Sequence, residues 1–182
     1  HFIILSAFII PFLWSCSSKQ EKIEKKLNNF ITGYEEKIIP LYKEMALTSW
    51  NANITGTDAD LKLSEKASFE LEKVYTDQAS FAILTEIKES KAVSDPLLAR
   101  QLDLLYNMYL GGQVDTSLIA KRLQMETEIN KKYLNFRAKV NGKDLTDNEV
   151  EGILRNSTSN SELQSAWEAH KLIGPVVAED VI

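Results

Sequence analysis

The chain has 182 residues, a formal net charge of −5 and a pI near 5.2, with acidic and basic side chains interspersed along it. Proteins that bind nucleic acid carry a basic patch, so this composition argues against a nucleic-acid partner. The single cysteine excludes an intrachain disulfide framework and any zinc site built from several cysteines. With 7 Gly, 4 Pro and few alternating β-branched runs, the sequence predicts helices.

The first feature along the chain is an uncharged apolar run, residues 2–14, that ends just before Cys16. It is too short to span a bilayer as a helix and has the length of the hydrophobic region of a signal peptide. Leu13 and Ser15 precede Cys16 in a pattern that resembles the lipobox of bacterial lipoproteins, in which the cysteine receives a diacylglycerol. We therefore expect a signal peptide at residues 1–15 and lipid attachment at Cys16. The alternative is a core helix with a buried free cysteine.

This interpretation predicts the domain boundaries and the location of the protein. A polar tether, residues 16–22, would lead into a helical domain, residues 23–182. Each buried methylene of an acyl chain contributes about 0.8 kcal/mol to membrane binding, so several chains hold a protein firmly. We expect a lipid-anchored protein of the bacterial cell envelope, at the outer membrane and facing the periplasm or the cell surface.

Helical spacing of apolar residues begins at Ile23 and continues to Met45, which predicts a long amphipathic helix ending in the turn-rich segment 51–56. Pro40 lies inside this stripe and costs about 3 kcal/mol in a regular helix. We therefore expect a kink near Lys37 or two helices that meet there. A second long helix is predicted over residues 58–90.

The later helices are marked by start signals. Pro96 follows a capping aspartate and opens a helix that stops at residues 111–112. Asp115 opens the next helix, and Thr146 and Ser159 each precede a glutamate at capping-box spacing. The inward residues predicted for the helix after Asp115 are Leu118, Met125, Ile129, Tyr133, Phe136 and Val140. The expected fold is an all-α array of about six helices.

Few residues in this sequence are candidates for chemistry. His170 is the only histidine besides His1, and its functional interpretation is a metal ligand or general base. Because no second histidine or cysteine is available to share a metal, we interpret it as a partly buried or helix-surface residue. Metalloprotease H-E-x-x-H, hydrolase G-x-S-x-G and EF-hand calcium motifs are absent from the sequence. Trp50 and Trp167 are interpreted as aromatic residues that pack between helices.

Four segments, in order, resemble the angiotensin-converting-enzyme-like (peptidyl-dipeptidase A) zinc metallopeptidases. Residues 47–55 read LTSWNANIT, which is similar to the W-N-x-N-I-T stretch near the start of that family. Residues 70–75 and 102–107 are similar to its next helices, and residues 153–174 are similar to a helix, a short break and an Ala-Trp-Glu segment. The resemblance covers residues 31–182, nearly all of the expected mature chain.

This resemblance implies a two-lobed helical zinc peptidase that releases C-terminal dipeptides from oligopeptides, with N-terminal helices that form a lid over a deep cleft. In the family two histidines and a later glutamate hold Zn²⁺, and the glutamate of H-E-x-x-H activates the metal-bound water. Those residues belong to the part of the family pattern that follows Ile182, so no catalytic or metal-binding residue is assigned here. Zinc and the oligopeptide substrate belong to the full-length parent.

The chain is therefore expected to be the N-terminal lid and part of the first lobe of such an enzyme, and to be inactive by itself. One alternative is a non-catalytic helical lipoprotein that acts as a peptide-binding or scaffold module. Another is a helical solute- or peptide-binding lipoprotein unrelated to peptidases, in which case the similarity of the four segments is fortuitous.

Overall fold

The structure, a computed structural model, describes residues 18–181, and their regular secondary structure is helical apart from one two-stranded sheet. The all-α prediction is confirmed. The predicted signal peptide and Cys16 lie outside the described residues. The elements are α1 (Lys19–Thr55), α2 (Asp58–Lys73), the 3₁₀ turn η1 (Val74–Thr76), α3 (Gln78–Glu89), α4 (Pro96–Gly111), α5 (Thr116–Asn135), β1 (Ala138–Val140), β2 (Lys143–Leu145), α6 (Asp147–Asn156), α7 (Asn160–Lys171) and α8 (Ile173–Val181).

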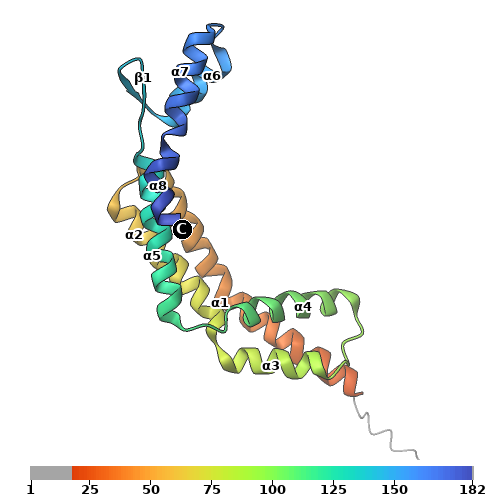
Figure 1. Cartoon of the computed structure of the whole chain (residues 1–182). Helices are drawn as coiled ribbons and strands as arrows, with labels where there is room; N and C mark the ends of the chain where they lie inside the picture. Colours follow the sequence, from red (N-terminus) through yellow and green to blue (C-terminus); the bar gives the residue numbers. More distant parts are fainter. Residues whose placement is uncertain (1–17, 182) are drawn as a thin grey trace, which may run out of the picture.

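The molecule is elongated and follows α1 along much of its length (Figure 1). α3 and α4 pack beside the N-terminal half of α1, whereas α2 packs along its C-terminal half and contacts α5 in turn. The strands, α6 and α7 form a lobe beyond the C-terminal end of α5, and α8 returns along α5 (Figure 1). α1 therefore runs from the end of the molecule formed with α3 and α4 to the part where α2 and α5 lie.

α1 has 37 residues, which at 1.5 Å per residue gives a length of about 55 Å. It begins at Lys19, where the Ser18 hydroxyl accepts a hydrogen bond from the backbone N–H of Glu21, so the helix starts inside the segment predicted as a tether. It continues through Pro40 as one helix, so of the two alternatives expected near Lys37 the meeting of two helices is wrong and the kink stays a prediction. Pro40 and Glu36, whose carbonyl the proline leaves without a partner, are both exposed, so water can satisfy that carbonyl.

The predicted helix over residues 58–90 is instead three elements. α2 ends at Lys73, η1 follows, and Asp77 starts α3 by accepting a hydrogen bond from the backbone N–H of Ser80 at 3.0 Å. Apolar residues keep helical spacing across this break, because Val74 of η1 and the apolar face of α3 enter the same core. Asp77 is a local signal for the start of a new helix, but the continuous apolar spacing favoured a single long helix instead.

The prediction for the segment after α5 is also wrong. α5 ends at Asn135, and Ala138 and Val140 lie in β1, which pairs with β2 in antiparallel register. Asn141 and Gly142 both have positive φ and make the two-residue turn between the strands. Leu118, Met125 and Tyr133, predicted to point inward, are exposed.

Two buried apolar clusters hold these elements together. The first joins α1, η1, α3 and α4 and contains Leu27, Ile38, Val74, Leu84, Ile87, Leu102, Leu105 and Tyr109. The second joins β1, α6 and α7 and contains Ala138, Val140, Val150, Ala166 and Ala169. The capping box predicted at Thr146 is present and begins α6, and Ser159 caps α7. The second cluster thus forms a small core of its own.

A close backbone contact yields the first prediction. A Cβ atom at Gly112 would lie 2.5 Å from Tyr75 Cβ and 2.7 Å from its carbonyl oxygen, whereas a Cβ at Gly111 would meet nothing within 4 Å. We predict that Gly112→Ala lowers the free energy of unfolding by about 1–3 kcal/mol, since η1 must move away. Gly111→Ala is the matched control and should be neutral or slightly stabilising. Urea unfolding measures both variants, and equal stability would contradict the contact.

Candidate functional site

Residues 47–55, which resemble the family motif and are called the motif segment below, form the last turns of α1. Ala52 is buried at 1% exposure, while the flanking Trp50 and Ile54 are 68% and 67% exposed. Asn53 donates a hydrogen bond from its side-chain amide to the carbonyl of Ser49 at 2.8 Å. Trp50 therefore does not pack between the described helices, and its interpretation as a residue of that kind is wrong. It is wrong for Trp167 on α7 as well, which is 56% exposed.

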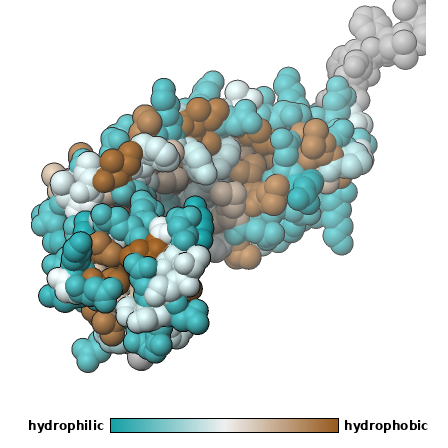
Figure 2. All heavy atoms as spheres, turned by 90° about the horizontal axis from the view of Figure 1, so that it is seen from above, coloured by the Kyte–Doolittle hydropathy of each residue, from teal (hydrophilic) through white to brown (hydrophobic). Residues whose placement is uncertain are grey.

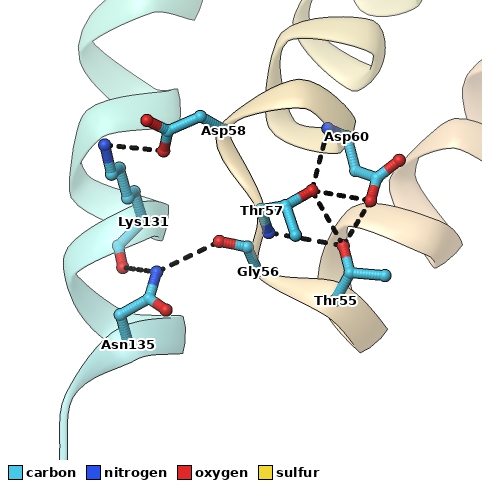
Figure 3. Close-up of polar contacts among 7 residues, drawn as sticks. All are labelled: Thr55, Gly56, Thr57, Asp58, Asp60, Lys131 and Asn135. Carbon is cyan, nitrogen blue, oxygen red and sulfur yellow. Dashed lines mark hydrogen bonds and ion pairs between the residues drawn. The ribbon is translucent and has the colours of Figure 1, made fainter.

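A compact turn follows this segment and leads into α2 (Figure 3). Gly56 has φ of 61°, the left-handed conformation that ends α1. Thr57 caps α2 by accepting a hydrogen bond from the backbone N–H of Asp60 at 3.3 Å. The carboxylate of Asp60 accepts hydrogen bonds from the hydroxyls of Thr55 at 2.5 Å and Thr57 at 2.7 Å. These bonds, with that from Thr55 the largest cause, lower the pKa of Asp60.

The same turn is fastened to the C-terminal end of α5 (Figure 3). Lys131 Nζ lies 2.7 Å from Asp58 Oδ1, and the side-chain amide of Asn135 donates to the carbonyl of Gly56 at 3.2 Å. The hydrogen bond and charge of Lys131 lower the pKa of Asp58, and the same contact raises the pKa of Lys131. The motif segment therefore has a fixed position relative to α5.

A pocket of about 660 Å³ lies at this end of α5, between α5, the lobe of α6 and α7, and the start of α8. His170 and Asp147 are among its lining residues, and His170 Nε2 lies 2.7 Å from Asp147 Oδ1. The prediction of His170 as a partly buried or surface residue is confirmed, since its side chain is 31% exposed. Arg137 and Lys171 add positive charge to the lining.

Sequence reasoning did not single out Asp147 or Asp60. Asp147 was visible only as the first residue after the cap Thr146, and Asp60 only as a polar residue in the first turn of a predicted helix. A carboxylate at the start of a helix is normally read as complementing the helix dipole. The contact of Asp147 with His170, which lies 23 positions later in the chain, depends on tertiary structure.

The donor set of this pocket does not fit a zinc ion. A catalytic zinc takes three protein ligands, usually histidines or a mixture of histidine and carboxylate. His170 and Asp147 provide two candidate donors, and no group of three or more His, Cys, Asp or Glu residues within 18–181 is arranged to hold a metal. No metal-assisted step can therefore be assigned to these residues.

A cluster of tyrosines at the junction of α1, η1 and α4 is structural. The hydroxyls of Tyr34 and Tyr75 lie 2.8 Å apart, and Tyr75 and Tyr109 stack edge to face at 5.4 Å between ring centroids. Burial, and for Tyr75 the bond to Tyr34, raises the pKa of both Tyr75 and Tyr109. Their hydroxyls stay protonated near neutral pH and do not act as bases there.

Comparison with known proteins identifies the family of this helical chain. The sequence model of the angiotensin-converting enzyme family matches residues 21–177, which include the motif segment, strands β1 and β2, and the residues that line the pocket. The chain belongs to the angiotensin-converting enzyme family, whose members are zinc-dependent peptidases in general. No curated protein and no solved structure matches the chain. Within residues 18–181, no helix is both long and apolar enough to cross a membrane.

The ion pair of Asp58 and Lys131 yields a pH-dependent prediction. Because the pKa of Asp58 is lowered on folding, its contribution is complete above the unfolded-state value of about 3.9 and is lost as the pH falls through the lower folded-state pKa. The pKa of Lys131 is raised, so its contribution is lost only as the pH rises through that higher value. Between these limits the pair should stabilise the protein weakly and be sensitive to salt.

A double-mutant cycle of Asp58→Asn and Lys131→Gln in urea unfolding measures this pair. The coupling energy should be stabilising at pH 7 and decline towards zero as the pH falls through the lowered folded-state pKa of Asp58. A coupling energy that does not change on acidification would show that the contact is not ionic.

Proposed function

We propose that this chain is the N-terminal helical portion of a lipid-anchored zinc metallopeptidase that releases C-terminal dipeptides from oligopeptides. The observation that carries the proposal is the family match over residues 21–177. In this proposal the motif segment and its turn form part of the lid, and the zinc ligands come from sequence that follows residue 182 in the parent protein. The 182-residue chain alone has no peptidase activity.

The exposed apolar face of α1 supports this proposal. It consists of Ile39, Tyr42, Leu47, Trp50 and Ile54, all of them more than half exposed. Such a stripe along a helix normally packs against another part of a protein. Seen from the end that carries α6 and α7, hydrophobic atoms reach the surface on the near lobe and on the body behind it (Figure 2). The remainder of a peptidase domain would cover surface of this kind.

The lipid anchor rests on the sequence around Cys16. The apolar run 2–14, the small residue Ser15 and the abrupt change to polar residues after Cys16 support cleavage before the cysteine and acylation of its thiol. A diacylglycerol with a further acyl chain would hold the protein at the surface of a bacterial membrane.

A second candidate function is a non-catalytic helical lipoprotein that binds peptides or acts as a scaffold. The pocket beside His170 favours it, because that pocket is present in these residues without a metal-binding group of side chains in the described part of the chain. The two candidates differ in whether zinc-dependent hydrolysis occurs in the protein at its native length.

The test compares two samples with a blocked oligopeptide and added zinc. The protein purified at native length from its source cells should release C-terminal dipeptides, and a chelator should abolish that activity. The 182-residue chain should release none. Zinc-dependent turnover by the 182-residue chain would overturn the proposed division of the enzyme. A native-length protein that lacks H-E-x-x-H and is inactive would favour the scaffold function instead.

A further inference from the structure

At one end of the molecule, hydrogen bonds join the start of α1 to the loop between α3 and α4. Glu24 Oε1 accepts hydrogen bonds from the backbone N–H groups of Ser94 at 2.9 Å and Asp95 at 3.2 Å, and Gln20 bonds to the hydroxyl of Ser94. The bonds from Ser94 and Asp95 lower the pKa of Glu24. We call residues 18–26 together with residues 91–100 the anchor end.

The anchor end is basic although the chain as a whole is acidic. Residues 19–26 contain four lysines and two glutamates, and Glu24 is occupied by backbone donors. Lys26 pairs with Glu86 at 2.6 Å. The other three lysines, Lys19, Lys22 and Lys25, are exposed and make no ion pair with the described residues. Lys91 and Arg100 are also exposed, as is Leu97 at 68%.

We propose that the anchor end binds the phosphate-bearing surface of an anionic lipid bilayer, with the lysines facing the headgroups and Leu97 at the interface. This inference rests in part on the proposed lipid attachment at Cys16. Three residues lead from Cys16 to Lys19, and an extended chain spans at most about 3.6 Å per residue. An acylated Cys16 therefore keeps the start of α1 within roughly 11 Å of the lipid.

The charge distribution favours one orientation on such a surface. Each lysine or arginine held near an anionic membrane strengthens binding roughly fivefold. The acidic remainder of this chain is repelled by such a surface. The anchor end would therefore face the lipid. The motif segment lies at the other end of α1, whose length is about 55 Å, and the pocket beside His170 lies beyond it.

The experiment measures binding of the full chain carrying Cys16→Ser to phosphatidylglycerol vesicles and to neutral phosphatidylcholine vesicles. Binding that depends on the apolar run 2–14 contributes to both vesicle types, so their difference isolates headgroup charge. Replacing Lys19, Lys22 and Lys25 by glutamine should weaken binding to phosphatidylglycerol on the order of 100-fold. Binding to phosphatidylcholine should not change.

The matched control replaces Lys66, Lys121 and Lys143 by glutamine. These lysines are exposed on α2, α5 and β2, and the change in net charge is the same. The control should keep most of the affinity for phosphatidylglycerol. Equal losses in the two triple variants, or no preference of the parent for phosphatidylglycerol, would overturn the proposal.

A second measurement locates the contact. In the Cys16→Ser background an introduced cysteine is the sole thiol, so an environment-sensitive fluorophore at Leu97→Cys can be compared with one at Leu172→Cys, another exposed leucine, near the pocket. Anionic vesicles should shift the emission at residue 97 to the blue and leave that at residue 172 unchanged; equal shifts would contradict the orientation. The mass of the protein with Cys16 intact reports lipid attachment separately, so failure of the anchor and failure of the lipid-binding end are distinguishable.

Discussion

Burial of one face of α1 is the constraint on which the rest of the structure depends. Long helices are stable in water chiefly through tertiary packing of an apolar face. Leu27, Ile38 and Ala52 are the buried residues of α1, and they are spread along its length. Different partners cover them, with α3 and α4 at the start and α2 at the end. One helix thus fixes the anchor end, the larger core and the motif segment relative to one another.

The exposed face of the same helix supports the proposed function. The stripe from Ile39 to Ile54 includes Trp50, the most conspicuous residue of the segment that resembles the peptidase family. A large apolar side chain that is two-thirds exposed contributes little to the stability of the described helices. Its presence is understandable if a further part of a peptidase domain packs on this face, which is the proposed function of the chain.

The positions of most helices could be predicted because their caps are local. Asp95 before Pro96, Asp115 before Thr116 and the capping box at Thr146 each act within one helical turn, and the structure has helices that start at all three. His170 was predicted on a different ground. It was interpreted as a partly buried or surface residue because the sequence offers few other metal ligands.

The errors arose where tertiary contacts decide the outcome. Tyr133, Phe136 and Val140 fit a helical period, yet Phe136, Ala138 and Val140 fit a strand period equally well, and burial against α6 and α7 selects the strand. The exposure of Trp50 could not be predicted, because an apolar stripe shows that a face is to be covered but not by which segment. The pairing of His170 with Asp147 likewise depends on how α6 and α7 pack.

The most direct test of this account is the oxidation rate of Trp50 in hydroxyl-radical footprinting. The 182-residue chain is compared with the protein isolated at native length from its source cells, and Tyr109, which is buried at 3% exposure, serves as the internal reference. The account predicts that Trp50 reacts readily in the 182-residue chain and is protected in the native-length protein. Equal reactivity in both samples would contradict the claim that the exposed face of α1 is an interface within a longer peptidase.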